Sequence, residues 1–249
     1  MTSRTQLSEF TTADTIRRQI VKTGTEALDD LLGGGLEVGL TYLFYGDSQL
    51  HDDLLRIAVS VQRPQQEGGL QSPTVVIDSV NILRSCRLAE YAIELGLEPE
   101  EVIRRIYVSR AFNSSQVFVL IMDELEEFFS RIRARLLIVS GFPDLFISEG
   151  VNVRHAQQMT QMARKISTFT MRHGIVTLVS APSSRGDIFT PAGGRALASS
   201  AQVHICVESL KSYIRYTLTK HPQYPVKRSS RPRESYLDLT PPLSDFLDI

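Results

Sequence analysis

The sequence predicts an α/β fold with a mainly parallel central sheet, helices on both faces and a C-terminal antiparallel hairpin. Short apolar runs rich in β-branched residues alternate with helical stretches along most of the chain. Early strands that alternate with helices form a parallel sheet covered on both faces, because each crossover helix must pack back on the sheet. The last two strands have no helix between them, so we expect them to pair as a hairpin.

The elements follow from these patterns in order. The expected strands are residues 41–45, 74–78, 105–109, 135–140, 175–180, 202–207 and 213–219. The expected helices are residues 51–62, 82–96, 114–134 and 153–174.

Both ends of the chain differ from this pattern. The first residues are polar with a helical patch, and the last mix basic residues, prolines and acids. We therefore expect an N-terminal linker over residues 1–20, a core domain over 21–225 and a flexible tail over 226–249.

Composition excludes several classes of protein. The hydrophobic share of 42% and the charged share of 22% are ordinary for a soluble globular chain, and no apolar run could span a bilayer. A net charge of −1 argues against a strongly basic nucleic-acid binder, so any DNA contact must be local. Cys86 and Cys206 suit a reducing compartment. Since no export signal is visible, we expect a cytoplasmic, nucleoid-associated protein, or a nuclear one if the source is eukaryotic.

A phosphate-binding loop is expected between the strand 41–45 and the helix that follows it. In the pattern GxxxxGK[ST], glycines let backbone N–H groups curl round the phosphates, lysine neutralises them and the hydroxyl holds Mg²⁺. Gly46 stands at the first glycine of this pattern. The positions of the second glycine, the lysine and the hydroxyl are taken by His51, Asp52 and Asp53.

The acids of this loop admit three interpretations. Asp47, Asp52 and Asp53 near a helix N-terminus stabilise the helix through its dipole, and the same acids repel a triphosphate. The loop is then a capped helix start. The alternatives are a cation held by His51, Asp52 and Asp53, or ordinary nucleotide binding. Beyond that alternative we expect no metal site.

Several stretches, in the same order along the chain, resemble motifs of the RecA/RadA recombinase family, in its archaeal and eukaryotic branch. They are TGTEALDDLLGGGLEVGLTYLFYG, GLEPEEVIRRIYVSRAFNSSQ, RLLIVSGFPDLF, IFTPAGGRALASSAQVHICV and KHPQYP. The resemblance covers roughly residues 10 to 226. It implies a RecA-like P-loop NTPase core and a role in homologous recombination and DNA repair.

The departures from the family pattern concern its ATPase site. Val80 stands where the family has the glutamate that activates water, and Ser140 stands where it has the aspartate that positions Mg²⁺. The polar sensor falls near Ala181, and the loop is about two residues shorter than the pattern. Since phosphoryl transfer depends on positioning and charge neutralisation, we expect a catalytically silent paralogue.

Such a paralogue would be an accessory subunit without enzymatic activity. It would have no cofactor of its own. The alternative is that it shares an ATP molecule with a neighbouring subunit. Two alternatives remain: a RecA/KaiC-like ATPase with a rearranged site, and a homo-oligomeric scaffold without a DNA role.

The resemblance also implies surfaces for assembly. Phe10 and Ala13 match the FxxA polymerisation motif, which adds a strand to a neighbouring subunit's sheet, although Phe10 could instead pack on its own domain. The receiving strand corresponds to Tyr107, Ser109, Arg110 and Ala111. These features predict docking on a RadA-type recombinase or a fellow paralogue.

Lys220 lies in the segment that resembles the family's ATP-cap turn. There it could contact the γ-phosphate bound by a neighbour, or it could be a solvated turn residue.

Two segments correspond to the family's DNA-binding loops, residues 148–155 and 183–194. Arg154, Arg185 and Arg195 within and beside them could bind phosphates of single-stranded DNA weakly, or they could be solvated. The tail ends in PPLSDFLDI, which is acidic with apolar anchors and resembles a docking peptide, although a disordered tail is the simpler interpretation.

Overall fold

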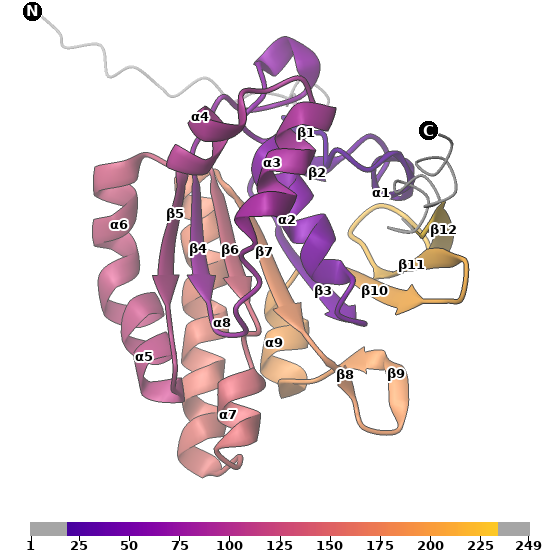
Figure 1. Ribbon diagram of the computed structural model, residues 1–249. Helices are drawn as coiled ribbons and strands as arrows, with labels where there is room; N and C mark the ends of the chain where they lie inside the picture. Colours follow the sequence, from indigo (N-terminus) through magenta and orange to yellow (C-terminus); the bar gives the residue numbers. More distant parts are fainter. Residues whose placement is uncertain (1–18, 234–249) are drawn as a thin grey trace, which may run out of the picture.

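Eight strands form one central sheet in a computed structural model that describes residues 19–233 (Figure 1). Their order across the sheet is β12-β11-β10-β3-β7-β6-β4-β5. The strands are β3 (Thr41–Gly46), β4 (Thr74–Asp78), β5 (Ile106–Arg110), β6 (Leu136–Ser140), β7 (Val176–Ala181), β10 (Val203–Ser209), β11 (Tyr213–Lys220) and β12 (Lys227–Pro232). The first six are parallel, while β11 and β12 are antiparallel to their neighbours. The predicted fold class and the hairpin β10–β11 are therefore confirmed.

Four helices cover one face of the sheet and the remaining larger helices cover the other. On the first face lie α1 (Glu26–Leu31), α2 (Leu50–Ser60), α3 (Ser85–Glu94) and α4 (Pro99–Arg104). On the second lie α5 (Ser114–Val119), the π-helical turn η2 (Leu120–Glu124), α6 (Leu125–Ile132), α7 (Asp144–Ser148), α8 (Val153–His173) and α9 (Gly194–Ser200). The smaller elements are β1 (Ile20–Val21), β2 (Leu36–Glu37), η1 (Gln65–Glu67), β8 (Ser183–Ser184) and β9 (Asp187–Pro191).

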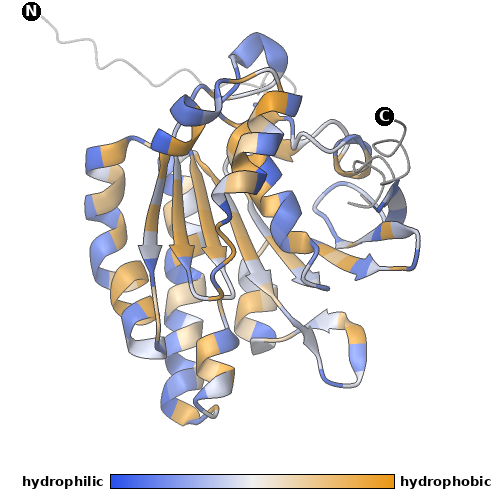
Figure 2. Ribbon diagram, viewed as in Figure 1, coloured by the Kyte–Doolittle hydropathy of each residue, from blue (hydrophilic) through white to orange (hydrophobic). Residues whose placement is uncertain are grey.

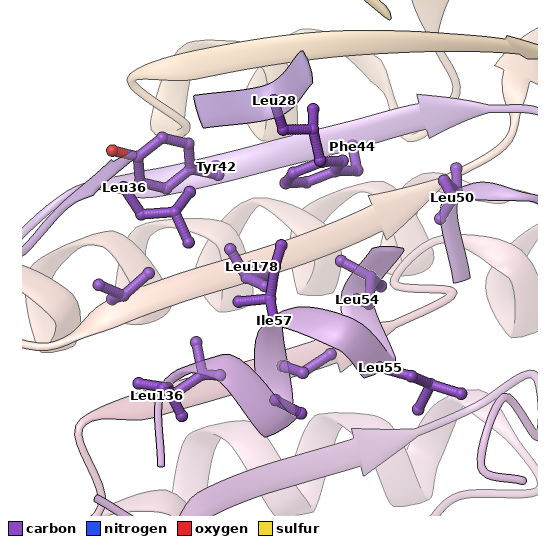
Figure 3. Packing of buried hydrophobic residues seen from close by; sticks show 14 of the residues in the cluster. Leu28, Leu36, Tyr42, Phe44, Leu50, Leu54, Leu55, Ile57, Leu136 and Leu178 are labelled. Carbon is purple, nitrogen blue, oxygen red and sulfur yellow. The ribbon is translucent and has the colours of Figure 1, made fainter. Parts of the chain in front are cut away.

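The alternation of side chains along β3 shows how the sheet separates two cores. Tyr42 and Phe44 point into the cluster under α1 and α2, whereas Leu43 and Tyr45 point into the cluster under α8. This is the period of two that a strand imposes, here with apolar residues on both faces. Apolar residues fill the central strands in Figure 2 and polar ones collect on the outer surfaces of the helices. Figure 3 shows the first cluster, in which side chains of α2 lie beside Leu178 of β7.

The ends of α8 follow from its sequence. Asn152 accepts a hydrogen bond from the N–H of His155, which caps the first turn. Gly174 ends the helix in the left-handed conformation, with φ of 56°. Between these caps Phe169 is fully buried and meets Phe129 of α6 edge to face, with ring centroids 4.9 Å apart.

Three expectations about elements and boundaries are corrected. Residues 227–232, assigned to a flexible tail, form β12, because their backbone pairs with β11 from Leu218 to Tyr213. Ile20, placed in a linker with a helical patch, belongs to β1 and pairs with Glu37. The single helix expected over 114–134 contains a π-helical turn at its centre and ends at Ile132.

Replacing Phe169 tests the core between the sheet and α8. We expect Phe169→Ala to lower the free energy of unfolding by about 3–5 kcal/mol, because it leaves a cavity and removes the ring pair with Phe129. The control is Met171→Ala on the same helix, 61% exposed, which should change stability by less than about 0.5 kcal/mol. Urea unfolding measures both, and equal effects would contradict the packing described.

Candidate functional site: the loop after β3 and the assembly surfaces

Gly46 ends β3 at the point where the chain passes closest to β10. Its φ is 122°, and a Cβ built on it would lie 2.2 Å from the carbonyl oxygen of Val207. Only glycine fits this approach. The next N–H, that of Asp47, donates to the same oxygen at 2.9 Å. The loop therefore begins bound to the neighbouring strand.

The backbone N–H groups of residues 49–52 are bonded within this loop. The hydrogen bonds are Gln49 N to Asp47 Oδ1, Leu50 N to Asp47 O, His51 N to Ser48 O and Asp52 N to Gln49 O, at 3.0 to 3.2 Å. A phosphate-binding loop needs such donors to point at its ligand. Here they stabilise a tight turn into α2, whose first residue lacks a side-chain cap, so the acids at 52 and 53 do not cap the helix as the capped-helix interpretation expected.

Asp53, at the position of the Mg²⁺-binding hydroxyl in the family pattern, is fully buried. Both of its carboxylate oxygens accept from the Tyr216 hydroxyl, at 2.9 Å. Arg231 Nη2 lies 3.3 Å from Asp53 Oδ1, and Arg231 Nε donates to the Tyr216 oxygen at 2.7 Å. The carboxylate of α2 is thus held by one residue of β11 and one of β12.

Burial raises the pKa of Asp53 from 3.8 to about 6, although Arg231 and the hydrogen bond from Tyr216 act in the opposite direction. Loss of hydration therefore outweighs the ion pair, as is usual for a buried carboxylate.

Asp52 and His51 have different surroundings. Arg87 of α3 lies 3.3 Å from Asp52 and 2.8 Å from Glu90, and its guanidinium stacks over the Tyr91 ring. Burial lowers the pKa of His51, while nearby carboxylates oppose this shift. Asp52 and Asp53 thus pair with cations on different elements, and within residues 19–233 no three His, Cys, Asp or Glu side chains could together hold a metal ion.

Ser140 and Val80 are both organised around Asp78, the last residue of β4. The Ser140 hydroxyl donates to Asp78 Oδ1 at 2.6 Å, and the N–H groups of Val80 and Ile82 reach the same oxygen at 3.3 and 3.2 Å. The Val80 side chain covers Gly141, where a Cβ would lie only 2.4 Å from Val80 Cγ1. At the positions that the family resemblance assigns to the water activator and the magnesium ligand, Val80 makes an apolar contact with Gly141 and Ser140 donates a hydrogen bond to Asp78.

The receiving strand predicted for assembly is β5, at one edge of the sheet. Tyr107 is 45% exposed, and Ser109 and Arg110 lie on the same strand, while Ala111 is buried where the strand ends. A cavity of about 490 Å³ next to this edge is lined by residues from Arg110 to Glu124. Phe10 and Ala13 lie outside the described residues, so their docking stays a prediction.

Lys220 contacts its own chain. Its ammonium donates to the carbonyl oxygens of Ala198 and Ala201, at 3.0 and 2.6 Å, where α9 ends. This is a C-terminal cap of the helix by a cation. Lys220 is the last residue of β11 rather than a turn residue, and it is exposed, as the solvated interpretation expects. Contact with a neighbour's phosphate stays a prediction.

The three arginines expected to bind DNA lie on separate elements. Arg154 is in the first turn of α8, Arg185 is in the turn between β8 and β9, and Arg195 is in the first turn of α9. All three side chains belong to exposed residues. The first expected loop joins the end of α7 to the first turn of α8, and the second contains an antiparallel hairpin.

Sequence reasoning missed the partners of the loop: Arg87, Tyr216 and Arg231. Arg231 was assigned to the tail, and 178 residues separate it from Asp53. The one available signal was the uncompensated pair of acids at 52 and 53, which requires cations when buried.

The sheet order and the strand, loop and helix unit around Gly46 define a RecA-type α/β core. A family model described as Rad51 matches residues 16–228. The chain therefore belongs to the Rad51 family, as the motifs predicted. Membership makes it a RecA-family protein related to recombination, and it supports partners of the general kind expected, other subunits of this family. No helix within residues 19–233 is long and apolar enough to cross a membrane.

The raised pKa of Asp53 predicts a pH-dependent stability. The folded state keeps the proton up to about pH 6, whereas the unfolded chain releases it near pH 3.8. The contribution of Asp53 to the free energy of unfolding is therefore fully present below pH 3.8, and it is lost as the pH rises through about 6. Relative to Asp53→Asn, the wild type should lose about 2–3 kcal/mol of unfolding free energy between pH 4 and pH 7.

Urea unfolding of both chains at four pH values measures this difference, in which other titrating groups cancel. A wild type that gains stability relative to Asp53→Asn over this interval would show instead that Arg231 and Tyr216 hold the pKa below 3.8.

Proposed function

We propose that this chain is a non-catalytic accessory subunit in homologous recombination and DNA repair, which binds a RadA-type recombinase or a recombinase paralogue. The observation that carries the proposal is the buried Asp53, bonded to Tyr216 and Arg231. A carboxylate at the hydroxyl position of a phosphate loop, with its cation already supplied by β12, favours a closed structural site.

Hydrolysis of ATP would need several groups that this site lacks in the expected positions. Phosphoryl transfer depends on positioned cations and donors that neutralise the charge on the phosphates. In this chain Arg87 and Arg231 are engaged with Asp52 and Asp53, the Asp47 N–H is bonded to Val207, and the N–H groups of residues 49–52 are bonded within the loop. Binding a triphosphate would require breaking these contacts and would place it beside two carboxylates. The geometry thus favours the silent paralogue over the rearranged ATPase.

Assembly with other subunits is the function that the exposed surfaces of the chain support. Among residues 19–233 no strand pairs with the outer side of β5, which also presents the exposed side chains of Tyr107 and Val108. An edge of this kind receives an added strand from a partner. In our proposal this edge receives one subunit, while Phe10 and Ala13 dock on another.

Contact with nucleotide or DNA is secondary in this proposal. An ATP cap by Lys220 would require its release from the end of α9. Three arginines on separate elements would give only a weak, salt-dependent affinity for single-stranded DNA.

Calorimetric titration of the full chain with Mg-ATP is the direct test of the closed site. We expect no binding below about 1 mM, because the donors and cations are engaged. A RadA-type recombinase in the same buffer is the positive control, and a second titration with that recombinase present tests for a shared site. Sub-millimolar binding by the chain alone that is lost in Asp52→Asn or Asp53→Asn would favour the rearranged ATPase instead.

A pull-down with Phe10→Glu tests docking. We expect the substitution to abolish association with the cognate recombinase or paralogue, because a charge cannot enter an apolar pocket without a large cost. Gln6→Glu adds the same charge four residues earlier and should leave association intact. Unchanged association of Phe10→Glu would remove Phe10 from the interface.

A further inference from the structure

A cleft of about 590 Å³ lies between α7, the β8–β9 hairpin and α9. Its walls are mainly apolar, with Ile147 from α7, Pro182 and Pro191 from the base of the hairpin and Ala198 from α9, and the hairpin adds the hydroxyls of Ser183, Ser184 and Thr190. Arg185 and Arg195 also line the cleft, and both are exposed residues. Apolar walls with cationic groups suit an acidic peptide that carries a bulky apolar anchor.

The arginines of the cleft are available for a ligand. Within residues 19–233 neither Arg185 nor Arg195 has an ion pair or a side-chain hydrogen bond, unlike Arg87 and Arg231 in the loop after β3. Each of these guanidinium groups can donate two parallel hydrogen bonds to one carboxylate. The walls contribute no aromatic ring on which a base could stack, which favours a peptide over single-stranded nucleic acid.

The cleft is formed in advance because the hairpin is bound to the sheet. The Tyr45 hydroxyl donates to the carbonyl oxygen of Phe189 at 2.8 Å, and the Cys206 thiol donates to that of Ile188 at 3.3 Å. Burial raises the pKa of Cys206 to about 11, so the thiol keeps the proton that it donates. Asp187 stabilises the turn by accepting from Phe189 N and the Thr190 hydroxyl. A preformed site costs little ordering when it binds.

We propose that the occupant of this cleft is the segment 234–249 of the same molecule. The segment lies outside the described residues, and its sequence supplies the complementary chemistry. It holds four acids, Glu234, Asp238, Asp245 and Asp248, and no lysine or arginine. Phe246 and Leu247 stand between two of these acids as apolar anchors. The charges of segment and cleft are opposite.

The place where the described chain ends permits this contact. β12 runs in the same direction as β10 and β7. Its last residues therefore lie at the end of the sheet where β7 leads into the cleft. Arg233 N donates to Ser212 O at this edge. Four strand spacings separate β12 from β7, which is about 20 Å. A dozen extended residues span about 40 Å, so Phe246 can reach the cleft.

Fluorescence anisotropy with a labelled peptide of residues 234–249 tests the proposal on the full chain. A tail variant with Asp238→Asn, Asp245→Asn, Phe246→Ala and Asp248→Asn should bind the peptide at least about tenfold more tightly than the wild type, whose own segment competes at high effective concentration. Adding Arg185→Glu and Arg195→Glu to the tail variant should abolish binding. The matched control adds Arg164→Glu and Arg228→Glu, which change charge equally on exposed residues outside the cleft.

Two results would overturn the proposal: no peptide binding by the tail variant, or binding that survives the charge reversal at Arg185 and Arg195. A single-stranded oligonucleotide that binds through these arginines, while the peptide does not, would make the cleft a nucleic-acid surface and would also overturn it. Circular dichroism checks that each variant is folded. Light scattering tests the source of the segment: a constant monomer mass is expected, whereas concentration-dependent association that is lost in the tail variant would assign the cleft to the segment of a second copy and would overturn the proposal.

Discussion

The contact between Asp53 and Arg231 is the constraint on which the structure around α2, β11 and β12 depends. A carboxylate buried at the first turns of α2 would be strongly destabilising without a cation and a donor. Arg231 and Tyr216 supply both, from the last two strands of the sheet. The position of β12 and the conformation of the loop after β3 are therefore linked: the strand supplies the cation, and the helix supplies the anion that holds the strand in register.

A second constraint acts at Gly46, where the loop meets β10. The carbonyl oxygen of Val207 lies so close that no side chain fits, and it accepts from Asp47. The Rad51-family chain thus keeps the architecture of the RecA-like core, and the groups at Gly46 and Asp53 bond to neighbouring strands of the same sheet.

Much of the fold could be predicted because its signals are local. Runs such as TVVID and RLLIVS place strands within one residue of β4 and β6, and helical spacing places α8 correctly between its caps. β12 could not be predicted, because KRSSRP has no apolar pattern and becomes a strand only by pairing with β11. The site divides in the same way. The unusual acids at 52 and 53 are visible in the sequence, but Arg87 and Arg231 are brought to them by tertiary packing. Likewise nothing in KHPQYP shows that Lys220 caps α9.

The separation of 178 residues between Asp53 and Arg231 has a consequence for biosynthesis. During translation the strand β3 and the helix α2 leave the ribosome long before β12 exists, so α2 cannot bury its carboxylate against a partner at that stage. Contacts of such high sequence separation form late, and their loops are entropically costly to close. The sheet can assemble around its parallel centre, but its antiparallel edge locks only when the last strand is released. Chains interrupted shortly before residue 231 would expose an unpaired edge at β11 and a carboxylate without its cation, which are features that promote aggregation and recognition by quality control.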